Sequence, residues 1–213
     1  MFLAEWFRVR DYEGSEPLYT HMPSFEELQE LLDINPASPA RICEAIAKIF
    51  EVRSTEVGLL TVEGDFLKFL FPVELQAAGA IPLSSSAVAA RSAALKQAVL
   101  FNRFPHVPHH TVFEQIKLSD AQPLSELPDP IQKLMSAPVI AENGSVIGVV
   151  QVCRKGMTPG IAGSDFTGSD LRLLEAVARR VALLMLELAP VSKRAPQDML
   201  HFHSENSKKR ASA

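Results

Sequence analysis

The chain has 213 residues, of which 47% are hydrophobic and 22% charged, which is typical of a globular protein with one buried core. Its net charge of −4 disfavours general attraction to nucleic acid, and no uncharged run reaches the roughly 18 residues that a membrane span requires. Cys43 and Cys153 are far apart and form no CxxC pair, which disfavours a disulfide framework and fits a reducing, cytoplasmic location.

The first segment of the chain, residues 1–37, has mixed character and is predicted to be an N-terminal arm with a short helix. Ser24 and Glu27 form a capping box at the start of that helix. Ser38 then caps a second helix, with Pro39 at its first position, and apolar residues recur after it at helical spacing.

Two short apolar runs follow, at residues 57–62 and 66–71. The turn residues Glu63-Gly64-Asp65 lie between them and indicate a hairpin. Residues 84–97 are rich in alanine and serine and predict a small helix, and a short strand is expected next. Residues 102–130 hold five prolines and three histidines without a clean period, so we expect a long loop of the kind that is often functional.

The strongest strand signal is a second hairpin around Asn143-Gly144, with strands expected at residues 137–142 and 145–154. The second strand is apolar at successive positions instead of alternating with polar residues, so both of its faces must be covered. The helices before and after the sheet can cover one face. Residues 84–130 are the segment of adequate size to cover the other.

The last predicted helix begins at Thr167-Gly168-Ser169-Asp170, where the aspartate lies near the positive end of the helix. Its apolar stripe continues to Leu188. Residues 191–213 are basic and nearly free of apolar side chains, so they are predicted to be a disordered tail. The predicted fold class is therefore α+β, with a central antiparallel sheet in a domain at residues 38–190.

From about Ser38 to Leu188, the order of elements and several motifs resemble the GAF domain family. The motifs that carry this resemblance most densely are Pro138-Val139, Gly148-Val149-Val150-Gln151-Val152, Lys155, Phe166-Thr167, Asp170-Leu171 and Leu174. The resemblance implies that the first and last helices lie together on one face of the sheet. It also implies a ligand pocket between the other face and the small helices and loops, a role in sensing or regulation, and dimerisation through the terminal helices.

Family members that bind cyclic nucleotides carry an Asn-Lys, Phe and Asp-Glu signature. Lys155, Phe166 and Asp170 occupy matching places here, but Arg154 replaces the asparagine and Leu171 replaces the glutamate. These two replacements disfavour cyclic-nucleotide binding. We expect Lys155 and Asp170 to form a structural ion pair that joins the end of a strand to the start of the last helix.

We expect the ligand pocket to lie between the sheet and residues 84–113, with aromatic and imidazole side chains as its walls. The predicted ligand-binding residues are Phe101, Phe104, His106, His109, His110, Phe113 and Gln151. A slip of one residue in strand register would turn Gln151 to the helix face instead. Alternatively, the phenylalanines fill the core. The three histidines could bind zinc or iron, but the neighbouring prolines disfavour a joint arrangement, so no metal site is assigned.

The leading hypothesis is a non-catalytic sensory or regulatory domain that binds a small ligand or a partner protein and forms a homodimer. The sequence assigns no catalytic residue and no cofactor, and it does not identify the ligand. The alternative is a small redox enzyme of the free methionine sulfoxide reductase type that acts through Cys153. A reactive thiol of low pKa would favour the enzyme, and an inert thiol would favour the binding domain.

Overall fold

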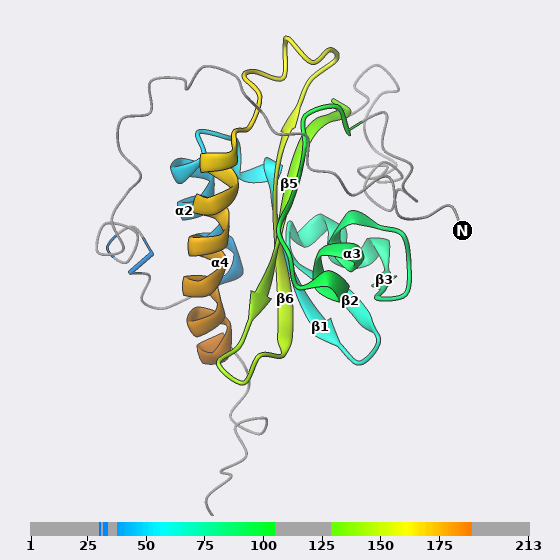
Figure 1. Cartoon of the computed structure of the whole chain (residues 1–213), viewed down its shortest axis with the longest axis vertical. Coiled ribbons are helices and arrows are strands. Elements are labelled where there is room, and N and C mark those ends of the chain that lie inside the picture. Colours follow the sequence, from blue (N-terminus) through cyan, green and yellow to red (C-terminus); the bar gives the residue numbers. More distant parts are fainter. Residues whose placement is uncertain (1–29, 31, 34–37, 105–128, 189–213) are drawn as a thin grey trace, which may run out of the picture.

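The structure is a computed structural model, and it describes residues 30, 32–33, 38–104 and 129–188. Most of the predicted N-terminal arm and its helix, residues 105–128 of the predicted loop, and the predicted basic tail lie outside the described residues. Over the described part of the chain the fold is α+β, as predicted, with a curled antiparallel sheet between two layers of helices (Figure 1).

The strands of the sheet pair in the order β3-β2-β1-β6-β5-β4, and each neighbouring pair is antiparallel. In chain order the described elements are α2 (Pro39–Ile49), η2 (Ser54–Glu56), β1 (Val57–Glu63), β2 (Phe66–Phe71), η3 (Val73–Ala78), β3 (Ala80–Pro82), α3 (Val88–Leu95), β4 (Val99–Phe101), β5 (Ile131–Ile140), β6 (Val146–Lys155) and α4 (Gly168–Leu188). The two longest strands, β5 and β6, pair with each other, and β6 also pairs with β1.

The two predicted helix caps that fall within the described residues, at Ser38 and Thr167, are both present. The Ser38 side chain accepts a hydrogen bond from the Arg41 N–H at 3.3 Å, and Pro39 occupies the first turn of α2. At the start of α4, the Asp170 N–H donates to Thr167 Oγ1 at 3.1 Å, while the Thr167 N–H donates to Asp170 Oδ2 at 2.6 Å. The single bond at Ser38 and the reciprocal pair at Thr167 satisfy N–H groups that have no partner within a helix, which is why the helices begin at these residues.

The hairpin at Asn143-Gly144 is also confirmed, but its first strand is longer than predicted. Gly144 has φ +78°, and Asn143 Oδ1 accepts from the Ser145 N–H at 3.0 Å. β5 begins at Ile131 instead of residue 137. The added residues include the charged Lys133, which is buried because it has polar partners in the chain segment before α4. Sequence pattern alone does not reveal such partners.

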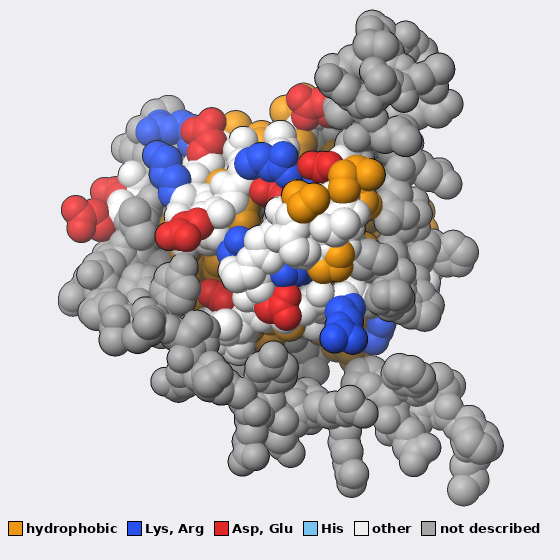
Figure 2. All heavy atoms as spheres, turned by 90° about the horizontal axis from the view of Figure 1, so that it is seen from above, with side chains coloured by type: hydrophobic (Ala, Val, Ile, Leu, Met, Phe, Trp, Pro, Cys, Tyr) orange, Lys and Arg blue, Asp and Glu red, His pale blue; other side chains and the backbone are white. Residues whose placement is uncertain are grey.

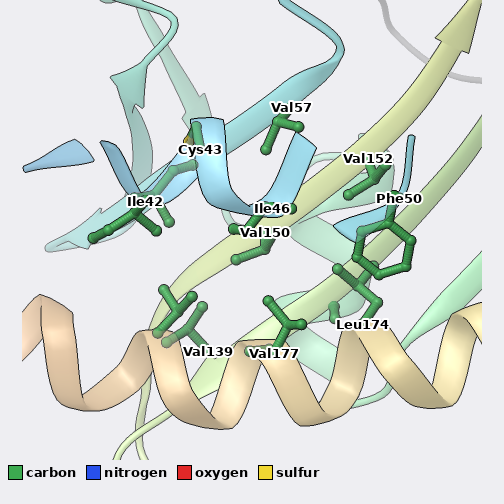
Figure 3. Close-up of a cluster of buried hydrophobic side chains, with 14 of the residues drawn as sticks. Ile42, Cys43, Ile46, Phe50, Val57, Val139, Val150, Val152, Leu174 and Val177 are labelled. Atoms are coloured by element: carbon green, nitrogen blue, oxygen red, sulfur yellow. The ribbon is translucent and has the colours of Figure 1, made fainter. Parts of the chain in front are cut away.

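One face of the sheet, which we call the helix face, is covered by α2 and α4 together (Figure 1). Side chains from both helices and from β1, β5 and β6 form one continuous apolar cluster, and Figure 3 shows its centre. The labelled members of this cluster are Ile42, Cys43, Ile46, Phe50, Val57, Val139, Val150, Val152, Leu174 and Val177. Their packing on one face confirms the arrangement that the family resemblance implies.

The close contact between β6, β1 and α4 depends on a glycine at position 148. A Cβ added at Gly148 would lie 2.4 Å from the Leu60 carbonyl oxygen and 2.9 Å from Met185 Cε. No real Cβ atom sits at such distances, so Gly148 allows the α4 side chain to approach the sheet backbone.

The opposite face of the sheet, which we call the α3 face, is covered by α3 and carries two separate apolar clusters. The first cluster includes Leu60, Leu67, Phe69, Ala89, Ala90, Ala93 and Val149. The second cluster consists of Val88, Phe104, Ile131, Leu134 and Cys153, with Val99 and Phe101 packed against it. Successive residues of β6 therefore contact different layers, which explains the unbroken apolar run and confirms that part of residues 84–130 covers this face.

Among the residues that the structure describes, no helix has both the length and the apolar character needed to cross a bilayer.

Candidate functional site

Gln151 lies on the α3 face of β6, between Val149 of the first apolar cluster and Cys153 of the second. Its side chain is only 3% exposed. Nε2 donates to Ser136 Oγ at 3.4 Å, and the buried Oε1 has no hydrogen-bond partner among the described residues. The strand register therefore turns Gln151 to the α3 face, as the predicted pocket requires. A role of Gln151 in binding stays a prediction.

Gln151 belongs to a group of buried polar side chains, Ser92, Ser136 and Gln151, that we call the polar seam. Ser136 lies opposite Gln151 on β5. The Ser92 hydroxyl lies 2.8 Å from the Gln97 carbonyl oxygen and 3.3 Å from the Ser136 carbonyl oxygen, so it links α3 to the sheet. The polar seam places uncharged hydrogen-bonding groups between the two apolar clusters.

Two of the predicted pocket-lining phenylalanines are described, and both belong to the second apolar cluster. Phe104 is buried there, and Phe101 is half-buried and packs against it. This placement fits both alternatives from the sequence, a pocket wall and a filled core. The other predicted wall residues, His106, His109, His110 and Phe113, lie outside the described residues. Within the described ranges, no group of three His, Cys, Asp or Glu side chains could hold a metal ion.

The two cysteines lie on opposite faces of the sheet. Cys43 packs in the cluster of the helix face, and Cys153 packs in the second cluster of the α3 face. Burial raises the pKa of the Cys153 thiol to about 12, although the nearby Lys155 charge acts in the opposite direction. Burial also raises the pKa of Cys43 well above its usual range. Both thiols are therefore protonated at neutral pH, and the sheet separates them.

The structure does not contain the predicted ion pair between Lys155 and Asp170. Lys155 Nζ instead donates to the Thr55 carbonyl oxygen at 3.0 Å. The Asp170 carboxylate accepts from the N–H and the hydroxyl of Thr167, at 2.6 and 2.8 Å. The helix cap supplies donors to this carboxylate over three residues of sequence, so the aspartate does not need a distant lysine.

A different ion pair joins the sheet to the segment before α4. Lys133 Nζ lies 2.7 Å from Asp165 Oδ1 and also donates to the Gly163 carbonyl oxygen. The Lys133 side chain is 4% exposed, and that of Asp165 is 57% exposed. Sequence reasoning missed this pair because Lys133 falls in a stretch without periodicity.

The residue before the α4 cap, Phe166, is held from two further sides. Asn102, which follows β4, donates from Nδ2 to the Phe166 carbonyl oxygen at 2.8 Å and accepts from the Phe166 N–H at 2.9 Å. The Arg154 guanidinium carbon lies 4.8 Å from the centre of the Phe166 ring. These contacts fix the start of α4 against both β4 and β6.

A second candidate site is an open pocket of about 320 Å³, which we call the charged pocket, at the end of the molecule where α2 and β6 end. Figure 2 looks onto the end that carries the β6–α4 connection, where basic and acidic side chains lie close together. The pocket is lined by Glu51, Val52, Arg53, Glu56, Asp129, Arg154, Lys155, Ile161 and Ala162. Sequence reasoning did not find it because these residues come from separate segments and match no motif.

The carboxylate of Glu56 organises the charged pocket. It is buried and accepts from Arg53 Nη2 at 3.0 Å, from the Arg53 N–H at 2.9 Å and from the Lys155 N–H at 2.7 Å. Burial acts to raise the pKa of Glu56, but these hydrogen bonds outweigh burial, so the pKa lies below its usual range. Glu56 is therefore an ionised structural group that holds Arg53 next to the end of β6.

Comparison with known proteins supports the same fold. The family model described as GAF domain matches residues 40–185. The GAF domain of an Acinetobacter phosphoenolpyruvate-protein phosphotransferase superposes with a TM-score of 0.56 at 13% identity, over 81% of this chain and 99% of that chain. The GAF domain of A. aeolicus nlh2 superposes with a TM-score of 0.51 at 11% identity, over 78% of this chain and 94% of that chain.

A third similar structure is the free methionine-R-sulfoxide reductase from Neisseria meningitidis, in complex with its substrate. It superposes with a TM-score of 0.52 at 16% identity, over 76% of this chain and 86% of that chain. At these identities the likeness is one of fold alone. A search of curated proteins found no match.

Proposed function

The chain belongs to the GAF domain family, and from this premise we propose that it is a non-catalytic sensory or regulatory domain that binds a small molecule on the α3 face of its sheet. The observation that carries this proposal is the buried Gln151 carbonyl oxygen, which has no hydrogen-bond donor among the described residues. A ligand with an N–H or O–H group on this face would supply that donor.

Energetics supports a binding role for the polar seam. A buried polar atom without a partner destabilises a fold by about 1–3 kcal/mol, so a purely structural position would favour an apolar side chain. Gln151 stands instead between two apolar clusters, next to the Ser136 hydroxyl. Apolar walls with a few polar groups are typical of small-molecule sites. Because the seam side chains are uncharged, the proposed ligand is uncharged where it contacts them.

The test is native mass spectrometry of freshly purified protein, followed by a thermal-shift screen of neutral metabolites, with Gln151→Leu as the test variant. We expect a bound molecule or a stabilising hit in the wild type that Gln151→Leu weakens by at least about tenfold, because a hydrogen bond to a buried group is lost. Gln97→Leu is the matched control, since Gln97 is exposed just after α3 and contacts the polar seam only through its backbone carbonyl oxygen. A molecule that binds Gln151→Leu as tightly as it binds Gln97→Leu, or the absence of any bound or stabilising molecule, would contradict the proposal.

We also propose that the protein forms a homodimer through α2 and α4. Two large apolar side chains on α4, Leu183 and Leu186, are exposed to solvent, and apolar surface of this kind favours association. We expect Leu183→Glu combined with Leu186→Glu to convert a dimer to a monomer in light scattering. Leu95→Glu, at an exposed position on α3, is the control and should leave the mass unchanged. A monomeric wild type would contradict the dimer.

The redox alternative requires a thiolate at Cys153. With a pKa of about 12 for this thiol, only a minute fraction is ionised at neutral pH, so we expect no reaction with a disulfide reagent until the protein is denatured. Rapid labelling of native Cys153 at pH 7, with Cys43→Ala to isolate the signal, would favour the enzyme over the binding domain.

A further inference from the structure

We propose that the charged pocket is a second binding site, distinct from the α3 face, and that it takes a small zwitterion of the amino-acid type. In this arrangement the ligand carboxylate faces Arg53 and Lys155, its ammonium group faces Asp129, and its apolar side chain packs against Ile161. The walls come from the turn after α2, η2, the segment before β5, the end of β6 and the connection to α4.

The positive side of the charged pocket has donors to offer. Glu56 fixes one nitrogen of the Arg53 guanidinium, and that side chain remains 59% exposed. A guanidinium carries five N–H donors, so the contact with Glu56 leaves others for a ligand carboxylate. Lys155 is a second basic residue of the same wall, and its ammonium group contacts the neighbouring Thr55 carbonyl oxygen through only one of its three hydrogens.

The negative side is close to the positive side without being joined tightly to it. Asp129 Oδ2 lies 4.0 Å from Arg53 Nη2, whereas a hydrogen-bonded ion pair has about 2.7–2.9 Å between these atoms. Opposite charges at this spacing suit a ligand that carries both charges on one carbon atom, as an α-amino acid does. A ligand with anionic groups alone would meet Asp129 and Glu51 in the same wall.

The apolar part of the wall is held in place although it is exposed. Ile161 is 70% exposed, yet the turn that carries it is closed by the Ala162 N–H, which donates to the Thr158 carbonyl oxygen at 3.1 Å. Next to Ile161, Gly156 is packed so closely against Ala162 that a Cβ there would lie 2.8 Å from Ala162 N. A large apolar side chain presented on a fixed turn beside paired charges gives a surface on which an aliphatic side chain can pack.

Size agrees with this ligand class. A volume of about 320 Å³ accommodates one amino acid and is at the lower end of the range for small-molecule sites. The charged pocket uses none of the seam residues, so the two sites can be occupied or lost independently.

The test is isothermal titration with L-leucine and two analogues that each lack one charge, L-leucinamide and 4-methylpentanoate. We expect wild-type protein to bind L-leucine, and each analogue to bind at least about tenfold more weakly because one charge-assisted contact is lost. Asp129→Asn should weaken the binding of L-leucine by a similar factor. The same substitution should also reduce the difference in affinity between L-leucine and 4-methylpentanoate, because the partner of the ammonium group has been removed.

Lys68→Met is the control, since Lys68 pairs with Glu63 in the β1–β2 hairpin and does not line the pocket. Amide chemical shifts should change at residues 51–56 and 154–162 on addition of L-leucine. The proposal is overturned if no L-leucine binding is detected at millimolar concentration, if either analogue binds as tightly, or if the shifts map to the α3 face. The last result would leave the proposed function standing while removing this site.

Discussion

The two faces of the sheet are built in different ways, although the same strands form both. On the helix face, Val150 and Val152 of β6 join one continuous apolar cluster with α2 and α4. On the α3 face, Gln151 of the same strand interrupts the apolar contacts and leaves two smaller clusters. The comparison teaches that continuous apolar packing on one side of the sheet is compatible with buried polar groups on the other side.

The largest expected effect is on the helix face. Leu174→Ala removes a fully buried side chain from the continuous cluster and should lower the free energy of unfolding by about 2–5 kcal/mol. Leu134→Ala makes the same change in the smaller second cluster of the α3 face, and we expect a smaller loss. Urea denaturation measures both. Equal losses would show that the two faces are packed equally well.

A second substitution tests how closely the layers of the helix face approach each other. Gly148→Ala places a methyl group against the Leu60 carbonyl oxygen and Met185, so it should destabilise by about 1–3 kcal/mol or more. Gly160→Ala is the control, because an added Cβ there meets nothing within 4 Å. Similar melting temperatures for the two variants would contradict the close approach of α4 to the sheet.

A third test concerns the buried charge on the helix face. Asp165→Asn leaves the Lys133 ammonium group buried with a weaker partner. A change of this kind lowers the free energy of unfolding by about 1–3 kcal/mol. We expect the lower part of this range because Asp165 is more than half exposed. Lys133→Met removes the buried charge itself and should be less destabilising than Asp165→Asn. The reverse order in thermal unfolding would show that the lysine, rather than its pairing, supports the structure.

The smallest expected effect is at the polar group of the α3 face. Gln151→Leu replaces a buried amide whose carbonyl has no partner, so the free energy of unfolding should change by less than about 1 kcal/mol and can increase. Chemical denaturation of the ligand-free protein measures this change. A loss above about 2 kcal/mol would indicate that Gln151 is a structural residue, and the contrast between the two faces would then disappear.

Local sequence signals predicted much of the fold. Ser38, Thr167 and Asn143-Gly144 each satisfy backbone groups within a few residues, so their caps and turn were readable without tertiary structure. The uninterrupted apolar run in β6 also predicted cover on both faces. These features depend on neighbours in sequence or on burial alone.

The candidate sites were less predictable because their contacts join distant residues. Lys133 fell outside the predicted strand, because its partner Asp165 lies far along the chain. The predicted pair of Lys155 and Asp170 was wrong because each side chain has a nearer partner, Thr55 and Thr167. The charged pocket has no sequence signature, since its walls come from short segments that lie far apart in the chain.

Asn102 connects the two faces of the molecule through a single side chain. Its side-chain amide makes two hydrogen bonds to the backbone of Phe166, which lies 64 residues later in the chain. The amide therefore pairs with Phe166 in the way that a neighbouring strand would. Phe101, just before Asn102, packs on the α3 face, while Phe166 belongs to the cluster of the helix face. Any shift of β4 that preserves both hydrogen bonds must therefore displace Phe166 and the first turn of α4 in the same direction.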